Sequence, residues 1–102
     1  MSDVGKKSRD KGYRGEYNLV KRLHELGIQA KRVPLSGGTS FQKHDIVFDD
    51  VVAEVKVRKK LPLYEWLGDA NILFVKQDYS DYLVVLRLED FVELYKKARG
   101  HE

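Results

Sequence analysis

Apolar residues alternate with polar ones on both sides of Asp49-Asp50, in the segment HDIVFDDVVAEVKV. A period of two is typical of β-strands, and two such runs separated by two turn residues predict a hairpin. With a two-residue turn at this point, Asp45 lies directly opposite Glu54. Lys56 follows Glu54 by two residues and therefore lies on the same face. Asp-Asp is a poorer two-residue turn than Asn-Gly, and a longer loop would change this register.

The rest of the chain alternates helical and strand periods. Its apolar stripe has helical spacing from about Tyr13 to Leu26, and Gly27 provides a C-terminal stop. Segment 82–88 is apolar enough to be a central strand. The order α-β-β-β-α-β-β-α predicts an α/β fold with a mixed sheet flanked by helices. The expected strands are 28–33, 45–48, 51–57, 72–76 and 82–88; the other helices follow Pro62 and span about 88–95; residues 34–43 form a loop.

Length and composition narrow the class of protein. A chain of 102 residues is expected to fold as one domain, over 12–102, after a basic and mobile arm over 1–11. Without cysteine, disulfides and thiolate zinc sites are excluded. No run approaches about 18 apolar residues, and the N-terminus lacks the apolar core of a signal peptide. We therefore expect a soluble, cytoplasmic protein that does not associate with membranes.

Charge is unevenly distributed. Residues 1–60 contain 14 Lys and Arg against 8 Asp and Glu, whereas residues 61–102 contain 5 against 8. A basic half that also contains the candidate site favours a polyanionic partner such as nucleic acid, although a solvated basic surface is the simpler alternative.

Two carboxylates held together beside a lysine indicate a site for a hard cation. The repulsion between Asp45 and Glu54 destabilises a hairpin unless a divalent cation is coordinated there. Glu16 lies on the stripe of Leu19, Val20 and Leu23, where a carboxylate is costly unless it is paired or binds metal. As an alternative, Glu16 lies in the first helical turn, where acids are favourable. Lys56 could likewise form a plain ion pair.

The ordered motifs from Lys11 to Lys60 resemble those of the PD-(D/E)XK nucleases. These are KGYRGEYNLVKRL, KRVPLSGG, HDIV and EVKVRKK. They are most similar to archaeal-type Holliday-junction resolvases, including relatives encoded by phages. His44 stands where the motif usually has proline, and the region after Lys60 matches these resolvases poorly.

The resemblance implies a restriction-endonuclease-like fold, with a mixed central sheet flanked by helices, and a nuclease site. Asp45 and Glu54, with the backbone carbonyl of Val55, would bind Mg²⁺, for which Mn²⁺ could substitute. Glu16 would complete the acidic cluster, directly or through water. Lys56 would orient or deprotonate the attacking water, or stabilise charge on the phosphate.

The implied activity is cleavage of branched DNA at four-way junctions. The aromatic segment after Pro62, with Tyr64 and Trp66, is one that a small domain can hardly bury, so we predict a homodimer with residues 61–67 in the contact. As an alternative, Trp66 simply caps the core. A related endonuclease acting on nicks, flaps or unbranched duplex remains an alternative, as does a catalytically silent DNA-binding module. Ser36 and Arg32 are expected at the branch point. The expected DNA contacts are Lys6, Lys7, Arg9, Lys11, Arg14, Arg32, Ser36, Lys43, Arg58, Lys59 and Lys60.

Overall fold

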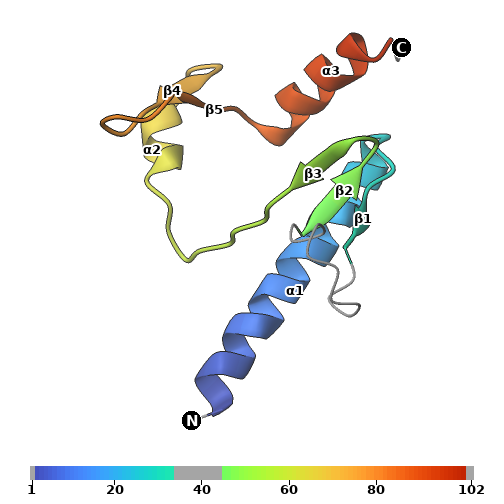
Figure 1. The fold of residues 1–102 in the computed structure, drawn as a ribbon, viewed down its shortest axis with the longest axis vertical. Helices are drawn as coiled ribbons and strands as arrows, with labels where there is room; N and C mark the ends of the chain where they lie inside the picture. The colour runs from blue at the N-terminus through green and yellow to red at the C-terminus, as the bar shows by residue number, and fades with distance from the viewer. Residues whose placement is uncertain (1, 34–44, 101–102) are drawn as a thin grey trace. The chain divides into compact units, whose positions relative to one another are not determined.

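The computed structural model describes residues 2–33 and 45–100, and only the backbone of 2–13 (Figure 1). The chain divides into two compact units, Met1–Arg58 and Lys59–Glu102. The order of helices and strands is the predicted one. The elements are α1 (Ser2–Glu25), β1 (Lys31–Arg32), β2 (Ile46–Phe48), β3 (Val51–Ala53), α2 (Leu63–Leu67), β4 (Leu73–Val75), β5 (Leu83–Val85) and α3 (Leu88–Ala98).

Helix α1 is longer than its apolar stripe predicts. It begins at Ser2 rather than near Tyr13, so the backbone of the expected arm continues the helix. The predicted start was wrong because residues before Tyr13 lack an apolar stripe, whereas backbone hydrogen bonding does not need one. The mobility of residues 1–11 and a single domain over 12–102 stay predictions. The helix ends as expected, before Gly27, whose φ is 93°.

The first unit contains an antiparallel sheet of order β1-β2-β3. Its hairpin has the predicted register, with Phe48 opposite Val51 and Ile46 opposite Ala53. The two-residue turn is therefore confirmed. Asp49 accommodates it with a φ of 53°, in the left-handed region that Asp tolerates better than most residues. The loop expected at 34–43 lies outside the described residues.

Helix α1 packs against this sheet over an apolar core. Leu23 faces the core from the helix, while Ile46 and Phe48 face it from β2, and all three are at most 6% exposed. Gly15 marks the closest approach, because a Cβ there would lie 2.6 Å from Cγ2 of Val57. The glycine therefore lets the helix approach the chain that follows β3. The other buried residues of this unit are Ile28, Ala30 and Val33.

The second unit contains α2, α3 and an antiparallel pair, β4-β5. Arg87 connects its elements, since the guanidinium donates to the carbonyl of Gly68 at 2.7 Å and to that of Ala70 at 2.9 Å. These bonds satisfy carbonyls just after α2. The predicted strand within 82–88 forms, but it pairs only with β4 in the described part of the chain. The expectation that it is central was therefore wrong there.

The α/β composition is confirmed, while all strand pairs of the described residues are antiparallel and belong to two separate sheets. The β2-β3 hairpin was predicted from its turn and alternation, whereas β1, β4 and β5 were predicted as strands without their pairing. The mixed central sheet stays a proposal. None of the helices described has the length and apolar character needed to cross a membrane.

Candidate functional site

The hairpin ladder changes at Asp45. Ile46 is paired with Ala53, and the N–H of Asp45 also donates to the carbonyl of Ala53, at 3.0 Å. Two residues of one strand thus oppose one residue of the other, which is the arrangement of a β-bulge. A bulge turns the side chain away from the direction that strict alternation predicts. The predicted pairing of Asp45 directly opposite Glu54 is therefore not formed.

The Asp45 carboxylate turns toward the chain that leaves β3. Its Oδ2 atom accepts the N–H of Val55 at 2.8 Å. This hydrogen bond to a charged acceptor replaces the ladder bonds that stop at Ala53, and it fixes the path of residues 54–57. The sequence contained no signal for this role, because it requires the bulge.

Glu16 projects from α1 into a partly buried ion pair. Arg32 Nε donates to Glu16 Oε1 at 2.9 Å, and the two side chains are 27% and 17% exposed, respectively. The strand register brings Arg32 to Glu16. Arg32 lies opposite Ile46 in the sheet, and the Ile46 side chain faces the core under α1, so Arg32 is directed to the same side. Glu16 lies near the middle of α1 rather than in its first turn, so the first-turn alternative is wrong. The prediction of an inward-facing carboxylate that needs a partner is confirmed.

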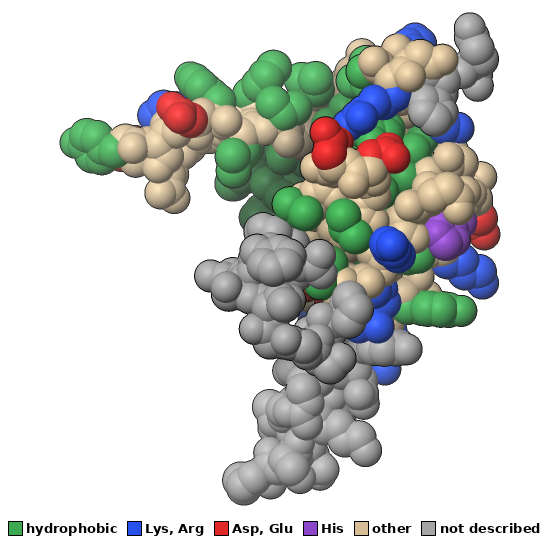
Figure 2. Space-filling model, turned by 45° about the vertical axis from the view of Figure 1, so that its right-hand side comes forward, with side chains coloured by type: hydrophobic (Ala, Val, Ile, Leu, Met, Phe, Trp, Pro, Cys, Tyr) green, Lys and Arg blue, Asp and Glu red, His purple; other side chains and the backbone are tan. Residues whose placement is uncertain are grey.

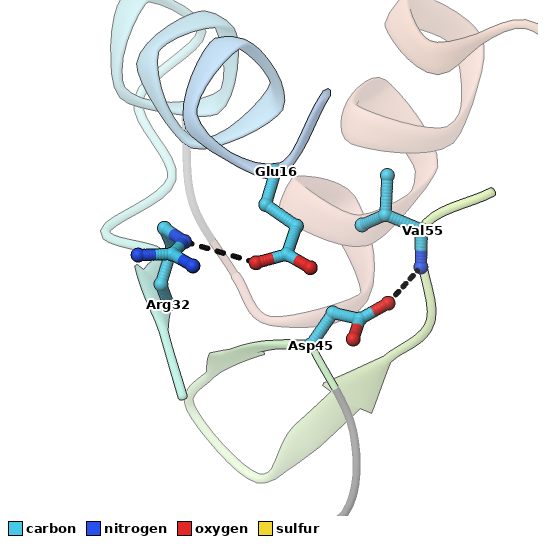
Figure 3. A network of polar contacts seen from close by, with 4 residues as sticks. All are labelled: Glu16, Arg32, Asp45 and Val55. Carbon is cyan, nitrogen blue, oxygen red and sulfur yellow. Dashed lines mark hydrogen bonds and ion pairs between the residues drawn. The ribbon is translucent and has the colours of Figure 1, made fainter. Parts of the chain in front are cut away.

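Figure 3 shows Glu16 and Asp45 in one view of the site, with the Glu16 carboxyl group directed toward Arg32 and the Asp45 carboxyl group directed toward Val55. We call these two residues the acidic pair. One oxygen of each carboxylate is held by a donor, Arg32 for Glu16 and the Val55 N–H for Asp45. The other oxygen is used in neither bond. Mg²⁺ commonly binds one or two carboxylates and completes its shell with water and substrate phosphate, so the donor chemistry of the acidic pair fits this cation.

Glu54 and Lys56 form an exposed ion pair with each other. Lys56 Nζ is 4.0 Å from Glu54 Oε2, and the side chains are 67% and 48% exposed, respectively. Such an exposed pair contributes little to stability. Among the described side chains, no three His, Asp or Glu groups gather closely enough to hold a metal ion. The described side chains thus do not gather Glu16, Asp45 and Glu54 into one cluster of three, and their metal-binding role stays a prediction.

The predicted DNA contacts are partly visible. Four of the expected contacts have exposed side chains, namely Arg14, Arg58, Lys59 and Lys60. Lys60 Nζ lies 3.9 Å from Glu65 Oε1. Arg32 is engaged with Glu16, a pairing that sequence reasoning missed. Nothing is described of the side chains of Lys6, Lys7, Arg9, Lys11, Ser36, Lys43 or His44.

The family model described as archaeal Holliday junction resolvase (hjc) matches residues 7–89, which is most of the chain. The chain belongs to this family, and thereby to the PD-(D/E)XK superfamily of nucleases. Searches of curated proteins and of solved structures gave no match.

Proposed function

We propose that this protein is a metal-dependent, structure-selective endonuclease that cuts DNA at four-way junctions. The family match supports junction DNA as the substrate class. The observation that supports catalysis is the acidic pair, because each carboxylate has one oxygen that its bond to Arg32 or to the Val55 N–H does not use and that could bind a cation. A pure binding protein has no need for such a pair.

The proposed metal ligands are Asp45 and Glu16, through the oxygens that the Val55 N–H and Arg32 do not occupy. Glu54 and the backbone carbonyl of Val55 belong to the proposed set as well. Mg²⁺ is the expected ion and Mn²⁺ its substitute. The bound ion lowers the pKa of a coordinated water and offsets negative charge on the phosphate.

The basic side chains near the acidic pair have separate proposed roles. Lys56 would orient or deprotonate the attacking water, or stabilise charge on the phosphate. Its 67% exposed side chain leaves the amine accessible to an entering DNA strand. Arg32 holds the Glu16 carboxylate through one oxygen, so its first role is to position that ligand.

A homodimer is part of the proposal. Resolving a junction requires two cuts on opposed strands, and two protomers related by a two-fold axis provide two sites. Residues 61–67 support this contact, because Tyr64 is 77% exposed and Trp66 is 62% exposed, so Trp66 does not cap a core. Exposed Trp and Tyr are frequent interface anchors. A central restriction-endonuclease-like sheet is proposed on the same family grounds.

The test is cleavage of a matched set of labelled DNAs, namely a four-way junction, a flap, a nicked duplex and a linear duplex, with Mg²⁺ or EDTA. We expect Mg²⁺-dependent cutting of the junction well above that of the other DNAs. Equal cutting of the linear duplex would contradict junction selectivity and support the related endonuclease instead.

A catalytically silent DNA-binding module is the second candidate. Junction binding without cutting of any DNA, in Mg²⁺ and in Mn²⁺, would support this candidate.

A further inference from the structure

The outward side of α1 presents a stripe of residues that neither the acidic pair nor the core uses. Arg14, Tyr17, Asn18 and Lys21 follow the spacing i, i+3, i+4 and i+7, which aligns side chains along one side of a helix. All four are exposed, whereas Leu23 on the inward side is 3% exposed. We call these four residues the outer stripe.

The composition of the outer stripe differs from an ordinary solvated helix face. It contains two cations, an amide and an aromatic ring that is 55% exposed, and no acid. The neighbouring cation, Arg22, is paired with Glu25 at 3.4 Å. Figure 2 shows Lys and Arg side chains on both sides of the purple histidine side chain, with an acidic side chain beside it. The side chain types of the outer stripe are those that contact phosphate and sugar, and Tyr and Asn add neutral donors to the charges.

The spacing of the two charges allows each to meet a different phosphate. Arg14 and Lys21 are separated by seven residues of helix, which is about 10.5 Å at a rise of about 1.5 Å per residue. Each strand of a duplex presents one phosphate for about every 3.4 Å along the duplex axis. Two cations separated by about 10.5 Å are therefore far enough apart to contact different phosphates of one duplex arm.

The outer stripe and Glu16 lie on opposite sides of α1. Glu16 lies between Arg14 and Tyr17 in sequence, on the inward side of the same rigid helix, paired with Arg32. A strand bound along the outer stripe is thereby kept at a fixed offset from the acidic pair. From these observations we infer that the outer stripe is a docking surface for the sugar-phosphate backbone of a duplex arm, with Tyr17, Asn18 and Lys21 as contacts beside Arg14. This inference rests on the proposed function.

The test measures binding of the full chain to a labelled four-way junction in EDTA, over a series of salt concentrations. Because each phosphate contact contributes a slope of about −0.9 in log K against log salt, Arg14→Gln/Lys21→Gln should make the slope shallower by about 2. Tyr17→Ala should weaken binding about tenfold without changing the slope, since a neutral contact releases no counterion.

The matched control removes two exposed lysines of the second unit, Lys76→Gln/Lys97→Gln, which lowers the net charge equally. Its slope should remain that of the wild type. Equal changes in the control and in the outer-stripe variant would overturn the inference in favour of general charge attraction. A wild-type slope in Arg14→Gln/Lys21→Gln would overturn it as well. If the wild type itself fails to bind the junction, the proposed function fails first, and the two failures are thereby distinguished. Circular dichroism checks that each variant is folded.

Discussion

The two hairpins of this protein have different sequence patterns, alternation in β2-β3 and apolar runs in β4-β5, and different surroundings. In β2-β3, Ile46 is fully buried and Phe48 is 6% exposed. In β4-β5, Phe74 is 61% exposed and Leu83 is 66% exposed. The first hairpin has a third strand, β1, and the helix α1 packed within its own unit, whereas β5 pairs only with β4 in the described chain. A local sequence pattern thus predicts that a strand forms, and the neighbouring elements decide whether its apolar side chains are covered.

This difference separates the roles of the two units. The first unit buries its apolar residues and uses its polar ones for the acidic pair and the outer stripe. The second unit exposes large apolar side chains on α2 and on the β4-β5 pair, among them Trp66, Phe74 and Leu83. Phe74 lies opposite Val84 and Leu83 lies opposite Val75, so the exposed apolar side chains of the β4-β5 pair occupy both of its faces.

The largest expected difference is in the free energy of unfolding when one phenylalanine of each hairpin is replaced by alanine. Phe48→Ala should lower the free energy of unfolding by about 3–5 kcal/mol, because it leaves a cavity in a core. Phe74→Ala should change it by no more than about 0.5 kcal/mol in the monomer, because the ring is already in water. Urea unfolding of both variants at low protein concentration measures the difference. Equal losses would show that β4-β5 is covered as fully as β2-β3.

The next effect concerns Asp45, the bulged residue of the first hairpin. Asp45→Ala removes the acceptor for the Val55 N–H and should cost about 1.5–3 kcal/mol. Asp45→Asn keeps an acceptor oxygen there and should cost less, about 1 kcal/mol. Thermal unfolding of the two variants makes the comparison. If both lose the same stability, the side-chain hydrogen bond does not fix the chain after β3.

The close contact between Gly15 and Val57 predicts that the effect of Gly15→Ala on stability changes sign when Val57 is shortened. Gly15→Ala alone should destabilise by about 1–3 kcal/mol, because the new Cβ would lie 2.6 Å from Val57 Cγ2 and would overpack the contact. In a Val57→Ala background that atom is gone, and Gly15→Ala should stabilise by up to about 1 kcal/mol through helix propensity. A double-mutant cycle in urea measures both. The same loss in both backgrounds would contradict the contact.

The smallest effect on folding is expected at Trp66, whose loss should instead weaken association. Trp66→Ala should leave unfolding of the monomer within about 0.5 kcal/mol of the wild type. It should shift sedimentation toward the monomer at micromolar concentrations in the presence of junction DNA. A wild-type protein that sediments as a monomer under these conditions would remove the homodimer and the proposed role of residues 61–67.

The order of elements and the register of the first hairpin could be predicted because both depend on local signals. Period two on either side of Asp49-Asp50 is sufficient for the register of Ile46 with Ala53. The inward direction of Glu16 followed from helical spacing in the same way. The bulge at Asp45 could not be predicted, since it depends on where the Val55 N–H finds an acceptor. The Glu16–Arg32 ion pair was missed because it joins a helix to a strand 16 residues away.

The central claim is that the acidic pair performs metal-dependent cleavage, and single-turnover cutting of a labelled four-way junction in Mg²⁺ tests it most directly. Asp45→Asn is the decisive variant, because it keeps an acceptor for Val55 and removes one charge. Junction binding should persist or tighten, since a negative charge facing phosphate is lost, while cutting should be abolished. Glu54→Gln, whose wild-type carboxylate lies outside the acidic pair, serves as the internal comparison and should also abolish cutting if Glu54 joins the metal site. Wild-type cutting rates in Asp45→Asn would contradict the claim.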